Sequence, residues 1–184
     1  RAVELLRAMD ILAVYPENLA AMAATRGALP LCEMAESQGL TRDLCTYARI
    51  SIGAALLPAG LLPVDLARPD LLVACNNICG TVVKWFEALA RIYDAPLFVL
   101  DTPFLANGLS SHALAYVASQ LEALIRWLEG RTGRWLEAKS LARAIRLSNE
   151  AITLWRDIRG ACRARPSPLN APDLFVQMAP IVVL

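Results

Sequence analysis

The sequence predicts an α/β fold: a Rossmann-like or flavodoxin-like parallel sheet with flanking helices, extended by a long helical pair. Three short, bounded runs are apolar on both faces, as parallel strands buried between helices are; they are Ile11–Val14, Asp70–Ala74 and Pro96–Leu100. Stretches with the period of amphipathic helices separate these runs. The alternation of the two patterns is what indicates a parallel sheet.

The expected helices follow in order. Those before Leu100 are Glu17–Arg26, Leu31–Gln38, Arg42–Leu57 and Val82–Tyr93. After Leu100 the strand signal stops and two long helices follow. Ser110 or Ser111 can cap the first of them, and the glycines of residues 130–133 end it. The second carries one apolar face made of Leu141, Ile145, Ile152, Trp155 and Ile158.

This pattern divides the chain into three expected parts. Residues 1–108 form an α/β domain, residues 109–165 form the helical pair packed on the same domain, and residues 166–184 form a proline-rich, extended exit segment. The chain begins at Arg1, and Ile181–Leu184 has the pattern of a strand with no turn after it. We therefore expect a piece of a longer protein.

Composition narrows the function classes. The 184 residues carry 18 Lys and Arg against 17 Asp and Glu, a balance that argues against a nucleic-acid-binding surface. Apolar residues make up 57% of the chain and the mean hydropathy is +0.44. The best candidate for a membrane span, residues 50–67, is interrupted by Pro58, Pro63 and Asp65. We expect no membrane segment and no export signal, and an apolar surface covered by another domain or subunit.

The chain has one histidine, His112, and five cysteines: Cys32, Cys45, Cys75, Cys79 and Cys162. A single histidine disfavours mixed Cys/His zinc sites, and no phosphate-binding glycine motif or G-x-S-x-G stretch occurs. Cys75 and Cys79 flank a strand end, where open α/β sheets bind ligands. Cys45 lies at the start of a helix, a position that favours thiolate. Free cysteine is also a common small core residue, so these thiols are either ligands or core filler.

Several motifs in order carry a family resemblance. They are residues 3–8 (VELLRA), 15–18 (YPEN), 43–49 (DLCTYAR) with Gly53, 76–79 (NNIC), 84–87 (KWFE) and 96–103 (PLFVLDTP). Together they resemble the 2-hydroxyacyl-CoA dehydratase family (2-hydroxyglutaryl-CoA dehydratase, D-component), which includes the smaller subunits of ATP-dependent benzoyl-CoA reductase. The sequence departs from the family at Ala2, Asp10 and Ala13, where Pro, Gly and Pro are usual.

The resemblance implies an iron–sulfur subunit of a radical acyl-CoA dehydratase or benzoyl-CoA-type reductase. Such a subunit pairs with a related sister subunit in a heterodimer, in the cytoplasm of anaerobic cells. An ATP-dependent iron–sulfur activator protein supplies one low-potential electron. The electron passes to an acyl-CoA thioester, giving a ketyl radical that leads to dehydration or to reduction.

The resemblance also assigns residues. Cys45 and Cys79 match the family's first two ligands of a 4Fe-4S cluster, and the third ligand belongs to a C-terminal α/β domain that this chain lacks, so the isolated chain is expected to be inactive. Cys75 is a substitute ligand or a buried strand-end thiol. Glu17 and Asn18 follow the first expected strand, so they face the thioester as catalytic residues or simply begin a helix.

Four further residues keep two interpretations each. His112 relays a proton or lies on a surface, and Arg49 meets a CoA phosphate or is a solvated charge. Asn76 and Asn77 donate hydrogen bonds to cluster sulfurs or form the turn after the strand.

Two alternative functions stay open beside the leading one. The chain is a non-catalytic electron-relay or structural partner subunit of the same complex, or a Rossmann-like binding module with buried cysteines. A relay subunit would tolerate Glu17→Gln, and a binding module would lose only packing on substitution of Cys45 or Cys79.

Overall fold

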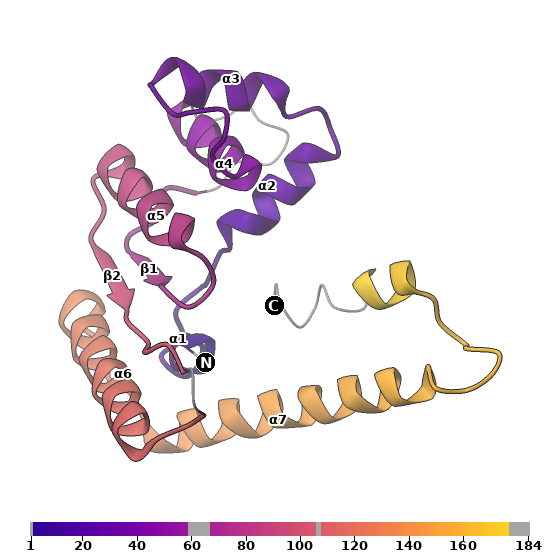
Figure 1. Ribbon diagram of the computed structural model, residues 1–184. Coiled ribbons are helices and arrows are strands. Elements are labelled where there is room, and N and C mark those ends of the chain that lie inside the picture. The colour runs from indigo at the N-terminus through magenta and orange to yellow at the C-terminus, as the bar shows by residue number, and fades with distance from the viewer. Residues whose placement is uncertain (1, 59–66, 106–107, 177–184) are drawn as a thin grey trace. The chain divides into compact units, whose positions relative to one another are not determined.

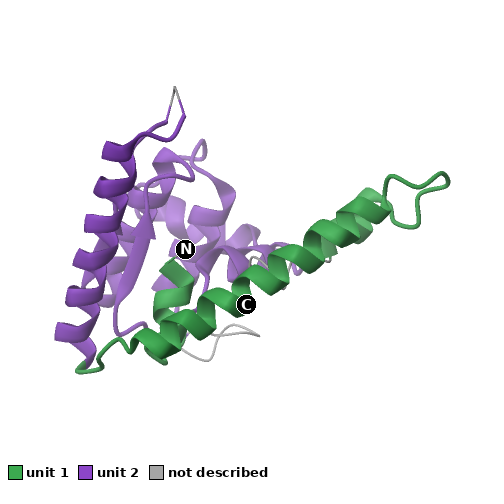
Figure 2. Ribbon diagram, turned by 90° about the horizontal axis from the view of Figure 1, so that it is seen from below, with its two compact units in different colours: residues 1–13, 133–184 green, residues 14–132 purple. Residues whose placement is uncertain are grey.

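The computed structural model describes residues 2–58, 67–105 and 108–176. The chain separates into two compact units, residues 14–132 and residues 1–13 with 133–184 (Figure 2). Each unit is described by itself below. The expected strand Ile181–Leu184 lies outside the described residues.

The larger unit holds most of the labelled elements (Figure 1). Three helices come first: α2 (Pro16–Ala24), α3 (Leu29–Ser37) and α4 (Thr46–Leu56). Strand β1 (Leu72–Cys75), helix α5 (Gly80–Tyr93) and strand β2 (Leu97–Leu100) then form a βαβ unit. Helix α6 (Ser111–Thr132) completes the unit. Ser110 caps α6, since its hydroxyl accepts a hydrogen bond from the Ala113 N–H at 3.1 Å.

The two strands are parallel, and their register pairs Leu72 with Leu97 and Cys75 with Leu100. Successive side chains of a strand point to opposite faces. Leu72 therefore points to the face that packs in a core cluster with Trp85 of α5. Phe98 points to the other face, where its ring lies 5.5 Å from that of Trp127 on α6. The sheet thus lies between α5 and α6, as an α/β fold requires.

One core cluster joins this sheet to the helices before it. Ala48 and Ile52 of α4 pack with buried residues of β1 and α5. On its other side α4 approaches α3 very closely, because a Cβ built at Gly53 would lie 1.9 Å from the carbonyl oxygen of Leu31. Only glycine permits this approach. Helix α4 is therefore held firmly between α3 and α5.

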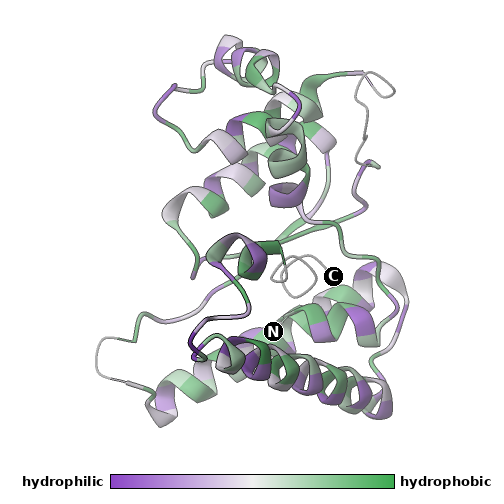
Figure 3. Ribbon diagram, turned by 90° about the vertical axis from the view of Figure 1, so that its right-hand side faces the viewer, coloured by the Kyte–Doolittle hydropathy of each residue, from purple (hydrophilic) through white to green (hydrophobic). Residues whose placement is uncertain are grey.

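The smaller unit packs α1 (Ala2–Ala8) against α7 (Ala138–Ala161). The Ser148 hydroxyl donates a hydrogen bond of 2.7 Å to Glu4. Hydrophilic and hydrophobic residues alternate along α7 (Figure 3), and none of its side chains is fully buried. Asp10 adopts a left-handed φ of 54°, a conformation that favours glycine, and Arg134 forms an ion pair of 3.0 Å with it.

The structure corrects three local expectations. Residues 11–15 form no strand, and Leu12 is 88% exposed; the two strands found among the described residues, β1 and β2, pair with each other. The helix expected over Arg42–Leu57 is α4, and it begins at Thr46 rather than Arg42, since residues 42–44 form a turn. In the exit segment, residues 171–176 are helical rather than extended.

Candidate functional site

Cys45 stands immediately before α4, in the N-cap position. Its thiol is free and exposed, and it makes no capping hydrogen bond within the described residues. The backbone at Cys45 is not helical, since its φ is −46° and its ψ is 128°. Leu44, its neighbour, packs against the core cluster shared by α4 and α5. The backbone is therefore anchored while the sulfur remains accessible.

Arg49 holds the chain on both sides of Cys45. Its Nε donates to the carbonyl oxygen of Leu44 at 3.1 Å, and its Nη2 donates to the Thr46 hydroxyl at 3.3 Å. Its Nη1 forms an ion pair of 2.5 Å with Glu36 of α3. The Arg49 side chain is only 14% exposed. The expectation of a solvated charge is therefore wrong, and these contacts leave the guanidinium occupied by protein groups.

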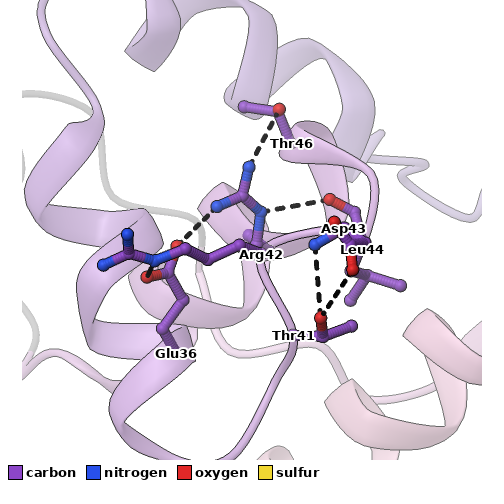
Figure 4. Close-up of polar contacts among 7 residues, drawn as sticks. Glu36, Thr41, Arg42, Asp43, Leu44 and Thr46 are labelled. Carbon is purple, nitrogen blue, oxygen red and sulfur yellow. Dashed lines mark hydrogen bonds and ion pairs between the residues drawn. The ribbon is translucent and has the colours of Figure 1, made fainter.

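Glu36 is shared by two arginines. Arg42 binds its second carboxylate oxygen at 2.9 Å (Figure 4), but the Arg42 side chain is 84% exposed. Burial raises the pKa of Glu36, and the hydrogen bonds and charges of Arg42 and Arg49 lower it by more, so its pKa lies below the ordinary value of 4.5. Glu36 therefore stays ionised and keeps Arg49 in place at neutral pH.

Cys79 stands in the equivalent position before α5. Its thiol is also free and exposed, and it too forms no capping hydrogen bond among the described residues. The backbone at Cys79 is fully extended, with φ −158° and ψ 161°. Both candidate ligands thus lie at helix starts, where unpaired backbone N–H groups favour negative charge.

Cys75 ends β1 and is half-buried. The register places its side chain on the sheet face that carries Phe98, the face covered by α6. Its thiol donates to Oδ1 of Asn77 at 3.1 Å. This environment favours the strand-end thiol over a substitute ligand.

Asn76 connects the ends of the two strands. Its Nδ2 donates to the Asp101 carboxylate, and its Oδ1 accepts hydrogen bonds from the backbone N–H and the hydroxyl of Thr102, each at 2.9 Å. Asn76 and Asn77 are exposed, and both make their polar contacts with other residues of this chain, which supports the turn interpretation. The loop that leads to Cys79 is thereby tied to the loop after β2.

Tyr116 of α6 extends this network. Its hydroxyl donates to the second oxygen of Asp101 at 2.5 Å. That hydrogen bond, with burial and the Asp101 charge, raises the pKa of Tyr116 above its ordinary value of 10.0. The ring also lines an open pocket of about 600 Å³ whose other walls include Phe104, Leu109 and the exposed His112. This pocket is mostly apolar and lies beyond the carboxyl end of β2.

Glu17 and Asn18 lie in the first turn of α2, half-buried. Neither side chain has a hydrogen-bond or ion-pair partner in the part of the chain that the structure describes. They do not follow a strand, because residues 11–15 form none. Their catalytic role stays a prediction.

The structure does not gather the predicted residues into a complete metal site. Among residues 2–58, 67–105 and 108–176, no three Cys, His, Asp or Glu side chains are grouped to hold a metal ion. No helix in these residues is long and apolar enough to cross a membrane. The sequence did not indicate that Glu36 holds Arg49 near Cys45. It also did not indicate that Asp101, with Tyr116, holds Asn76 in the loop before Cys79. The four-residue spacing from Cys45 to Arg49, about one helical turn, is a signal that could have indicated part of this support.

Comparison with known proteins identifies the family. Residues 2–184 match the family described as 2-hydroxyglutaryl-CoA dehydratase, D-component. The chain is 40% identical to the (R)-2-hydroxyisocaproyl-CoA dehydratase alpha subunit of Clostridioides difficile, over 97% of this chain and 44% of that protein. It is 35% identical to the alpha subunit of the lactoyl-CoA dehydratase of Anaerotignum propionicum, over 95% and 45%.

A more distant relative is a benzoyl-CoA reductase subunit of Thauera aromatica, at 29% identity over 74% of this chain and 32% of that protein. The chain spans less than half the length of these three relatives. The match to the family extends over almost every residue and agrees with the order of motifs in the sequence. This chain belongs to the 2-hydroxyglutaryl-CoA dehydratase D-component family.

Proposed function

We propose that this chain is the cluster-bearing part of a 2-hydroxyacyl-CoA dehydratase subunit, with Cys45 and Cys79 as two ligands of a 4Fe-4S cluster. The family resemblance implies that the third ligand belongs to a C-terminal α/β domain outside this chain. The observation that carries the proposal is the matched position of the two thiols. Both are free and exposed at the start of helices that share one core cluster.

The donor set suits this cofactor. Thiolates are the usual ligands of iron–sulfur clusters. The unpaired N–H groups of a first helical turn are also available to sulfur, and hydrogen bonds to sulfur help to set a cluster's potential. When bound, the cluster supplies a single low-potential electron to the thioester. A sister subunit and an ATP-dependent activator complete the proposed complex in the cytoplasm.

The chain's own residues bind and orient the substrate in this proposal. The apolar pocket beside Tyr116 accommodates the acyl group. Glu17 and Asn18 face the thioester or its leaving hydroxyl in this proposal, where the Asn18 amide can donate a hydrogen bond and the Glu17 carboxylate can accept one. The 40% and 35% identities to two dehydratase alpha subunits, each over at least 95% of this chain, support dehydration over ring reduction, since the benzoyl-CoA reductase subunit matches at 29% over 74%.

Iron and acid-labile sulfide test the proposal, measured anaerobically on the full-length subunit with its partner. We expect Cys45→Ser and Cys79→Ser each to lose the cluster. Cys162→Ser is the matched control, since Cys162 ends α7 and its thiol donates to Ile158 instead. Iron that stays at the wild-type level in both ligand variants would contradict the assignment and favour a binding module with structural cysteines.

Glu17→Gln separates the catalytic role from the electron-relay alternative. We expect turnover to fall about a hundredfold while the iron content stays unchanged, because an acid–base group typically contributes that much. Glu33→Gln, an exposed change on α3, is the control and should retain full turnover. Full turnover in Glu17→Gln as well would favour a relay subunit.

A further inference from the structure

Arg49 is placed to fix the direction of the Cys45 thiol. Its three donor nitrogens reach the residue before Cys45, the residue after it and a carboxylate on another helix. The contacts to Leu44 and Thr46 lie one on each side of the N-cap position. Any rotation of the backbone at Cys45 would break at least one of them.

Only an arginine side chain can make these contacts together. The guanidinium is planar and presents its N–H donors in a fixed fork, whereas a lysine ammonium is one compact point charge. Glu36 lies 2.5 Å from the guanidinium and is itself only 16% exposed, so it fixes the position of the fork. Within the turn itself, the Leu44 N–H donates to the Thr41 carbonyl oxygen at 3.1 Å, the Asp43 N–H donates to the Thr41 hydroxyl at 3.3 Å, and that hydroxyl donates to Asp43 at 3.4 Å. None of these three hydrogen bonds reaches α4, whereas those of Arg49 do.

We propose that Arg49, held by Glu36, is a positioning residue that orients Cys45 as a cluster ligand. The proposal rests on the proposed function, because it treats Cys45 as a ligand. In this role Arg49 needs no contact with the cluster or the substrate. It acts through the backbone of Leu44 and the hydroxyl of Thr46, and the ion pair with Glu36 balances its charge.

The test compares Arg49→Lys and the double variant Glu36→Gln/Arg49→Gln with Arg42→Gln in the full-length complex. The double variant removes the ion pair without leaving a buried charge unpaired, since Arg42, the other partner of Glu36, is exposed to solvent. Arg42→Gln is the matched control, because Arg42 also binds Glu36 but has no contact with Leu44 or Thr46. Amide hydrogen exchange of residues 41–47 in cluster-free protein measures the order of the loop independently of iron.

We expect both Arg49 variants to lose exchange protection at residues 41–47 and the control to retain it. In cluster-loaded protein, we expect iron release to a chelator about tenfold faster in the Arg49 variants, as for other residues that support metal ligands. The electron paramagnetic resonance spectrum of the reduced cluster should also change. A purely electrostatic role would be rescued by lysine, and we expect no rescue.

Two outcomes would overturn the proposal, and they differ from a failure of the proposed function. Unchanged exchange protection in both Arg49 variants would show that Arg49 does not hold the loop. Altered exchange with unchanged iron release and spectrum would show a structural role alone, provided that Cys45→Ser loses iron. If Cys45→Ser retains its iron, the ligand assignment itself fails and the proposal falls with it.

Discussion

The two candidate cysteines occupy the same position at two helix starts, yet different forces hold them. The chain around Cys45 is fixed by a charged contact, Arg49 to Glu36, that spans 13 residues of sequence. The loop before Cys79 is fixed by Asn76, whose partners Asp101 and Thr102 lie 25 and 26 residues further on. The support at Cys45 is an ion pair between α3 and α4. The support at Cys79 is the side-chain amide of Asn76, which joins the ends of β1 and β2. Changes in packing, amide chemistry and pH should therefore affect the two sides differently.

Gly53→Ala should destabilise the packing of α4, the helix that follows Cys45, and should have the largest effect of these changes. The new Cβ would lie 1.9 Å from the Leu31 carbonyl oxygen, and backbone cannot yield as a flexible side chain does. We expect a loss of about 3 kcal/mol in the free energy of unfolding, measured by urea denaturation of the full-length protein. Gly130→Ala on the exposed side of α6 meets nothing within 4 Å and should stabilise by about 0.5–1 kcal/mol. Equal effects of the two changes would contradict the close approach of α4 to α3.

Asn76→Asp should affect the Cys79 side alone. It removes the donor to Asp101 and sets two carboxylates against each other, so we expect a loss of about 1–2 kcal/mol in unfolding free energy. Hydrogen exchange at residues 76–80 should rise while exchange at residues 41–47 stays unchanged. Asn77→Asp is the control, because its carboxylate can still accept the hydrogen bond from Cys75. A rise in exchange at both helix starts would mean that the two supports are coupled.

The same contrast explains what the sequence could predict. The position of Cys45 at a helix start follows from local pattern, and α5 was expected within two residues of its observed bounds. The first strand was wrong, because an apolar run such as Ile11–Val14 does not reveal whether a pairing strand exists. Asn76 and Tyr116 both contact Asp101 across a distance in sequence that no local motif encodes.

Low pH should weaken the ion pair between Arg49 and Glu36, which supports the chain around Cys45. The pKa of Glu36 is lowered in the folded protein, so its contribution to stability is complete above pH 4.5 and disappears as the pH falls through the lower folded value. We expect the urea midpoint of the wild type to approach that of Glu36→Gln as the pH falls below 4.5. The effect should be smaller than that of Asn76→Asp, because ion pairs near the surface contribute little. If the urea midpoints of the wild type and Glu36→Gln kept a constant difference below pH 4.5, the Glu36 carboxylate would not be the group whose protonation removes this support.

High pH should weaken the hydrogen bonds that join Tyr116 and Asn76 to Asp101, which support the loop before Cys79. This effect on stability should be the smallest of these. The pKa of Tyr116 is raised in the folded protein, so its contribution is complete below pH 10.0 and disappears as the pH rises through the higher folded value. Loss of the phenolic proton removes the donor to Asp101 and places two negative charges together. The urea midpoints of the wild type and Tyr116→Phe should therefore converge above pH 10.0, whereas those of the wild type and Glu36→Gln should keep their separation there. Opposite pH limits for the two helix starts would establish that an ionic support at Cys45 and a hydrogen-bonded support at Cys79 act independently of each other.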